Sequence, residues 1–154
     1  MGKKGEGYVV VQMVLFGLIA SGPWLVGGGF VPSSLSTLGR VFGFGMMLLG
    51  VGLGFGGVVS LGDNVTALPR PKEDARMVEH GAYRLVRHPI YSGIIISAFG
   101  WAIFMNRWFV LLMAVVLFLF FDLKSRQEER WLVEKYAGYE RYRERVKKLI
   151  PFVY

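Results

Sequence analysis

Long runs without a charged side chain constrain this sequence more than any other feature. Residues 7–39 contain no Asp, Glu, Lys or Arg, and neither do residues 41–62. Two shorter uncharged runs follow at 88–106 and 108–121, and only Arg107 separates them. A helix needs about 20 apolar residues to cross the hydrocarbon core of a bilayer, so the first two runs are each long enough. We predict that the last two form a tight helical hairpin, whose second arm continues through Asp122 to complete its crossing.

These runs predict an all-α membrane protein with about four transmembrane helices, at residues 8–30, 38–61, 90–105 and 108–146. The length of 154 residues favours one domain over 1–154. Only 19% of the residues are charged, whereas a soluble domain carries roughly 25%. The first apolar run exceeds the roughly 7–15 residues of a signal peptide, so we expect a retained helix. The absence of cysteine excludes disulfides and thiolate metal sites, and we predict no metal site.

The basic residues are distributed very unevenly along the chain. With the N-terminus inside, residues 1–7, 63–87 and 122–154 lie in the cytoplasm and hold 16 of the 18 Lys and Arg side chains. This positive-inside bias predicts an integral membrane protein with cytoplasmic N- and C-termini. Anionic lipid headgroups then account for the net charge of +7, and we expect membrane lipids, not nucleic acid, as partners.

A first polar cluster occupies residues 81–93, with the sequence GAYRLVRHPIYSG, where the loop meets the third predicted helix. Arginine, histidine and tyrosine are costly at this depth unless they have partners, which suggests a functional site. Pro89 also begins a helix whose N-terminal N–H groups favour an anion such as a carboxylate. The alternative is that these side chains only anchor the helix at the membrane interface.

A second cluster, Glu128-Glu129, follows the last apolar run by one or two helical turns. Alone, the pair is compatible with a solvated helix face or with a carboxylate site for a cationic group. The predicted hairpin returns it beside the first cluster. Carboxylates, a helix N-terminus and aromatic faces together suit a ligand that bears an ammonium group, a carboxylate and a flat base. S-adenosylmethionine has these parts, and aromatic faces or carboxylates can hold its sulfonium.

The two clusters resemble the G-x-Y-R-x-x-R-H-P-x-Y-x-G signature and acidic tail of isoprenylcysteine carboxyl methyltransferases and related phospholipid methyltransferases. The resemblance extends over roughly 38–152 and includes Leu61-Gly62-Asp63-Asn64 and Pro71-Lys72 before the signature. It implies that the cofactor S-adenosyl-L-methionine is bound by Val78, Tyr83, His88, Pro89, Ile90, Tyr91 and Glu128. It also implies that a basic residue, Lys124 or Arg126, faces the acceptor. We predict catalytic positions at this residue and at Glu129. The tail departs from the family by one residue in Tyr136-Ala137-Gly138-Tyr139, which affects the expected C-terminal contacts.

The expected activity is therefore methyl transfer from S-adenosylmethionine to a lipophilic acceptor that enters from the bilayer. If a general base is needed, Glu129 and His88 are the candidates. Prenylated cysteine, a phospholipid amine, a thiol and a quinone-like lipid are all compatible acceptors, and the oligomeric state is open. Two other functions compete with this one. Sterol reductases share an Arg-x-His-Pro motif and bind a nicotinamide cofactor, and a non-catalytic membrane module would keep only the pocket.

Overall fold

The computed structural model describes residues 6–30, 32–64, 66 and 76–154, and within these ranges every regular element is helical. This confirms the predicted all-α fold. Pro71 and Lys72, part of the sequence resemblance, lie outside the described residues. The described residues form five α-helices and three short 3-10 helices: α1 (Glu6–Leu25), η1 (Ser33–Leu35), α2 (Ser36–Leu61), η2 (Gly62–Asn64), η3 (Gly81–Arg84), α3 (Pro89–Met105), α4 (Trp108–Lys135) and α5 (Tyr139–Arg145).

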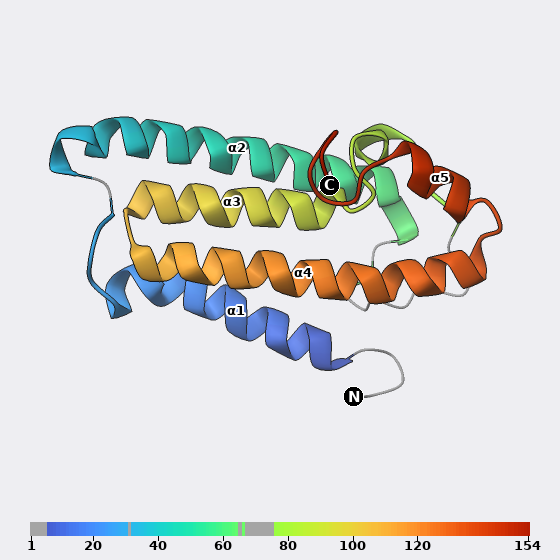
Figure 1. The fold of residues 1–154 in the computed structure, drawn as a ribbon, viewed down its shortest axis with the longest axis horizontal. Coiled ribbons are helices and arrows are strands. Elements are labelled where there is room, and N and C mark those ends of the chain that lie inside the picture. Colours follow the sequence, from blue (N-terminus) through green and yellow to red (C-terminus); the bar gives the residue numbers. More distant parts are fainter. Residues whose placement is uncertain (1–5, 31, 65, 67–75) are drawn as a thin grey trace.

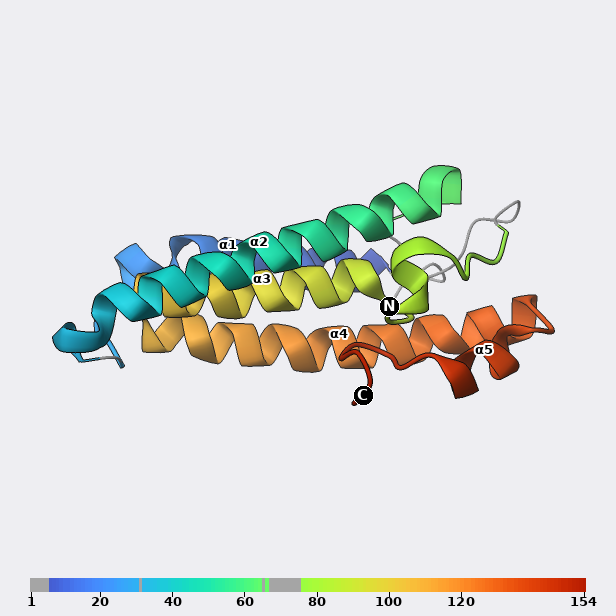
Figure 2. The ribbon, with the colours of Figure 1, turned by 90° about the horizontal axis from the view of Figure 1, so that it is seen from above.

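The four long helices run up and down in sequence order (Figures 1 and 2). α3 packs between α2 and α4, and α1 packs on α4. The start of α1, the end of α2, η3 and α5 therefore lie at one end of the bundle, which we call the polar end. The buried core between the helices is apolar, with Leu117, Phe121, Ala102 and Val110 among its members.

Three of the helices, α1, α2 and α4, are long and apolar enough to cross a membrane. α3 has 17 residues and is about 26 Å long at ~1.5 Å per residue, somewhat short of a hydrocarbon core of about 30 Å. The predicted hairpin between α3 and α4 is confirmed. Asn106 adopts a left-handed backbone conformation at the turn, and Arg107 donates a hydrogen bond from Nε to the carbonyl oxygen of Pro23.

Two predicted helix ends are wrong. The helix expected over 8–30 ends at Leu25, because the following glycine run leaves the helical conformation and Gly28 has a φ of +97°. The helix expected over 108–146 stops at Lys135, where Tyr136 is extended. The chain turns through Ala137 and Gly138 and continues as the separate helix α5 beside α4 (Figure 2).

Glycines seven residues apart bring α2 and α3 into close contact. Gly43, Gly50 and Gly57 are the buried residues of α2, and they face Gly93, Gly100 and the first turn of α3. A methyl group added at Gly93 would lie 2.5 Å from the carbonyl oxygen of Gly50. Small residues allow this backbone approach between membrane helices, so the expected packing role of these glycines is confirmed.

Gly93→Ala is therefore expected to destabilise the protein by separating α2 from α3. Overpacking of this kind costs about 1–3 kcal/mol, and the melting temperature in detergent should fall by several degrees. Gly52→Ala is the matched control, because nothing lies within 4 Å of the position its methyl group would take. Equal melting temperatures for the two variants would contradict the tight α2–α3 contact.

Candidate active site

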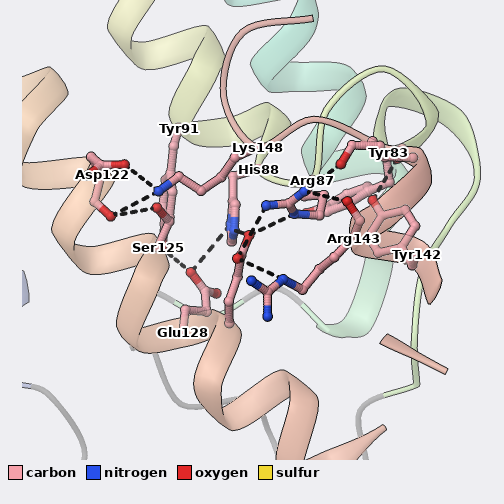
Figure 3. Close-up of polar contacts among 12 residues, drawn as sticks. Tyr83, Arg87, His88, Tyr91, Asp122, Ser125, Glu128, Tyr142, Arg143 and Lys148 are labelled. Carbon is pink, nitrogen blue, oxygen red and sulfur yellow. Dashed lines mark hydrogen bonds and ion pairs between the residues drawn. The ribbon is translucent and has the colours of Figure 1, made fainter. Parts of the chain in front are cut away.

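A small cavity of about 100 Å³ lies at the polar end of the bundle, where η3, the start of α3, the second half of α4 and α5 meet. Its wall includes Val78, His88 and Glu128. Four tyrosines also line it: Tyr83, Tyr136, Tyr139 and Tyr142. The two sequence clusters predicted to meet therefore do so. Figure 3 shows the polar side chains that connect them.

His88 lies at the centre of these contacts. It is the residue immediately before Pro89, where α3 begins. The imidazole stacks on the ring of Tyr91 at an interplanar angle of 4°. Its Nε2 is 3.1 Å from Glu129 Oε1, and its Nδ1 is 3.7 Å from Glu128 Oε2. The buried histidine thus lies between the two glutamates.

Glu129 forms a buried ion pair with Arg87. Arg87 donates from Nε to Glu129 Oε1 at 2.8 Å and from Nη2 to Oε2 at 3.3 Å. The same guanidinium donates from Nη1 to the carbonyl oxygens of Arg143 and Val146. Glu129, predicted from the sequence at a catalytic position, joins α4 to the signature segment through Arg87 and to α5 through Arg143, whose Nε is 3.6 Å from Oε2.

Glu128 borders the cavity itself. Its Oε2 accepts a hydrogen bond of 2.9 Å from the hydroxyl of Tyr91, and its side chain remains 21% exposed. The carboxylate is thus held by α3 while facing the hollow. Of the two glutamates, Glu128 is therefore the one in the lining of the cavity.

The tyrosine wall contains one polar atom that lacks a partner. Over the part of the chain that the structure describes, the hydroxyl of Tyr139 is the buried side-chain oxygen without a hydrogen bond. Buried hydroxyls nearly always have a partner, so this hydroxyl is available for a hydrogen bond to a bound group. Tyr136 and Tyr139 both reach the wall, although the segment between them is one residue shorter than in the resembled family.

The neighbouring hydroxyls of Tyr83 and Tyr142 stay protonated. Burial, and then the charge of Glu128, raises the pKa of Tyr83 well above its usual range. Burial also raises the pKa of Tyr142, whose hydroxyl donates to the carbonyl oxygen of Tyr83 at 2.6 Å. Neither phenol can therefore act as a base near neutral pH.

The remaining predicted residues lie in four different places, none of them in the lining of the cavity. Pro89 is buried at the start of α3, whereas Ile90 lines a second, apolar hollow described below. Lys124 is buried against α1, where its Nζ donates to Gln12 Oε1. Arg126 is not brought to the cavity: its side chain is 61% exposed and pairs with Asp122 at 2.8 Å.

The sequence predictions missed a segment that supports the signature. The backbone N–H groups of Arg87 and His88 donate to the carbonyl oxygens of Lys147 and Lys148 at 2.8 and 3.2 Å. Lys148 forms a buried ion pair with Asp122 (Figure 3). An acidic residue at the end of an apolar run needs a compensating partner, so Asp122 was the signal that could have indicated this contact.

Lys148→Met should weaken this support. Breaking a buried ion pair costs about 3–5 kcal/mol, and the lower end applies because Asp122 keeps its contacts with Arg126 and Tyr154. We expect a clear decrease in melting temperature. Lys147→Met serves as control, because its side chain is exposed and only its backbone carbonyl contacts Arg87. A similar decrease in both variants would contradict the role of the Lys148–Asp122 pair.

The second hollow is an apolar groove of about 740 Å³ between α1 and α2, over α3. Phe16 and Trp24 of α1, Val51 of α2 and Ile94 of α3 are among its lining residues. Gly50 and Gly54 also line it, so the glycines of α2 both pack on α3 and leave room in the groove. Its size and apolar walls suit a hydrocarbon chain.

Together these features define an all-helical integral membrane protein with a polar ligand cavity and an adjoining apolar groove. Residues 38–138 match the phospholipid methyltransferase family. The chain belongs to this family, which confirms the resemblance in its sequence motifs.

Curated relatives give the same assignment. The chain is 33% identical over 116 residues to "Protein-S-isoprenylcysteine O-methyltransferase B" of Arabidopsis thaliana, covering 73% of this chain and 59% of that protein. It is 30% identical over 128 residues to "Protein-S-isoprenylcysteine O-methyltransferase" of Schizosaccharomyces pombe, covering 80% and 54%. A "Probable protein-S-isoprenylcysteine O-methyltransferase" of Oryza sativa subsp. indica is 33% identical over 100 residues, covering 62% and 52%. The chain thus spans between half and three fifths of the length of these relatives.

Proposed function

We propose that this protein transfers a methyl group from S-adenosylmethionine to a lipophilic acceptor in the membrane. The observation that carries the proposal is that the cavity and the groove adjoin across the first turn of α3. His88 lines the polar cavity, and Ile90, two residues later, lines the apolar groove. A water-soluble methyl donor and a lipid-soluble acceptor can therefore approach each other from opposite sides of one helix turn.

The side chains of the cavity fit the methyl donor. Glu128 supplies a carboxylate for a cationic group, and the rings of Tyr83 and Tyr136 suit a flat base. The hydroxyl of Tyr139 lacks a partner and would gain one from a polar ligand. At about 100 Å³ the cavity is smaller than the roughly 300–1,000 Å³ of typical ligand sites, so its walls must separate when the donor binds.

The chain's own residues then act by positioning and by exclusion of water. S-adenosylmethionine, when bound, supplies a methyl group on a positively charged sulfur. Glu128 binds the cationic part of the donor, and Tyr91 orients that carboxylate through its hydrogen bond. Glu129 holds His88 and Arg87 in place. An anionic acceptor needs no general base. For a protonated acceptor His88 is the candidate base, because it lines the cavity whereas Glu129 is paired with Arg87.

The groove and its surroundings indicate the class of acceptor. A prenyl or acyl chain would occupy the apolar groove, with the reacting group toward the polar end. The relatives' names point to an isoprenylated cysteine, and we propose this class for the chain. Lys124, not the outward-facing Arg126, is then the basic residue on the acceptor side. The concentration of Lys and Arg at the polar end supports a cytoplasmic location for that end, and we propose that both termini lie on that side of the membrane.

Calorimetric titration of the detergent-purified protein tests the cofactor. We expect saturable binding of S-adenosylhomocysteine and no binding of NADPH. The reverse result would favour the reductase-like alternative. Binding of neither compound by correctly folded protein would overturn the proposal, and binding of S-adenosylhomocysteine without turnover of any lipid acceptor would favour a non-catalytic module.

A further inference from the structure

Gln12 is a buried polar residue in the inner half of α1, with 9% of its surface exposed. Its Oε1 accepts a hydrogen bond of 2.8 Å from the ammonium group of Lys124 on α4, which is only 1% exposed. Charged side chains within membrane helices are costly and usually serve a function. A buried lysine held by a residue of another helix therefore calls for an explanation beyond packing.

The Gln12–Lys124 pair lies in line with the apolar groove. Phe16 and Leu117 line the groove, and residues four or seven apart share one face of a helix. Gln12 is one turn beyond Phe16, and Lys124 is two turns beyond Leu117, both toward the polar end. The pair therefore lies at the inner end of the groove, where the head of a bound hydrocarbon chain would lie.

Lys124 also approaches the wall of the cofactor cavity. Its Nζ lies 5.1 Å from the centroid of the Tyr91 ring, and the hydroxyl of that ring is bonded to Glu128. One aromatic side chain thus separates the ammonium group from the carboxylate proposed to bind the methyl donor. This is the region in which the acceptor's reacting group must meet the methyl group.

We propose that Gln12 is a positioning residue that holds the Lys124 ammonium where it receives an anionic reacting group of the acceptor. This inference rests on the proposed function and deepens it. An acceptor carboxylate is attracted to Lys124, whereas an ammonium group is repelled. The amide of Gln12 is neutral, so it orients the lysine without adding a negative charge that would oppose the acceptor.

The chemical balance agrees with this arrangement. The acceptor oxygen forms a bond to the methyl carbon as the carbon–sulfur bond breaks. The negative charge of the acceptor and the positive charge of the sulfonium are both lost, and the products are an ester and a thioether. No proton moves, so the site requires a cation that positions the oxygen and does not require a base.

The test uses the 154-residue chain in liposomes. S-farnesyl-N-acetylcysteine is the carboxylate acceptor, and a farnesyl thioether that carries an amine in place of the carboxylate is the comparison. The variants are Gln12→Met, Gln12→Glu, Lys124→Met and the double variant Gln12→Met/Lys124→Met. We expect Gln12→Met and Gln12→Glu each to raise the KM for the carboxylate acceptor about tenfold, while the Kd for S-adenosylhomocysteine changes less than twofold. In the Lys124→Met background, the additional Gln12→Met change should have little effect.

An unchanged KM in both Gln12 variants would overturn the inference, as would equal effects of Gln12→Met with and without Lys124. Gln12→Glu keeps a polar partner for Lys124, so it remains informative if Gln12→Met does not fold. Wild-type protein that binds S-adenosylhomocysteine but methylates only the amine would overturn the inference and leave the proposed function in place. Failure of the wild type to bind S-adenosylhomocysteine or to methylate either compound would instead remove the proposed function on which the inference rests.

Discussion

Glu128→Gln should raise the Kd for S-adenosylhomocysteine by about 10-fold to 100-fold in detergent-purified protein. The change removes the negative charge that borders the cavity but keeps the shape of the side chain. A hydrogen bond to a charged group contributes about 1.5–3 kcal/mol, and each 1.4 kcal/mol is about tenfold in affinity. The hydroxyl of Tyr91 can still donate to the amide oxygen, so the fold and melting temperature should change little.

Glu134→Gln is the matched control for this experiment. Glu134 lies on the same helix, less than two turns further on, and its side chain is exposed. Its variant should bind S-adenosylhomocysteine as the wild type does. Equal binding by Glu128→Gln and the wild type would show that the carboxylate beside the cavity does not hold the ligand.

Arg87→Leu should have the largest effect on stability. It leaves Glu129 buried without its main cationic partner, and breaking a buried pair costs about 3–5 kcal/mol. It also removes the guanidinium that donates to the carbonyl oxygens of Arg143 and Val146. We expect the melting temperature to fall steeply and S-adenosylhomocysteine binding to be lost with it.

The double variant Arg87→Leu/Glu129→Leu separates charge burial from binding. Replacing both members of a buried pair with apolar residues is often nearly neutral for stability, so its melting temperature should recover in part. Its binding should stay weak, because His88 no longer has its contact with Glu129. Arg141→Leu, on the exposed face of α5, is the control for loss of an arginine. A double variant as unstable as Arg87→Leu alone would argue against an unpaired buried glutamate as the cause.

The sequence was most informative where a single local rule determines the structure. Uncharged runs predicted the helices, Arg107 marked the hairpin turn, and Pro89 marked the start of α3. The two wrong helix ends lie where the same apolar or charged pattern continues but the helical backbone does not. The glycine run that contains Gly28 follows the end of α1 closely, and α4 ends before the extended residue Tyr136. A hydrophobic pattern alone does not show where either helix ends.

The candidate site was predicted only in part, for a related reason. Motif residues such as His88 and Glu128 meet because the hairpin brings their helices together, which the sequence already indicated. The Lys148–Asp122 and Lys124–Gln12 contacts join residues 26 and 112 positions apart. Helical periodicity shows which residues share a face, but it does not show which helix that face will contact. These partners therefore required the three-dimensional arrangement.

The central claim, methyl transfer to a membrane-embedded acceptor, is tested most directly with radiolabelled substrate. The wild-type protein and Glu128→Gln, each reconstituted in liposomes, are incubated with S-adenosylmethionine labelled in its methyl group and with S-farnesyl-N-acetylcysteine. We predict that label enters the organic phase as a base-labile methyl ester with the wild type, and that Glu128→Gln incorporates far less. No transfer to this acceptor or to extracted membrane lipids, by wild-type protein shown to be folded, would contradict the account.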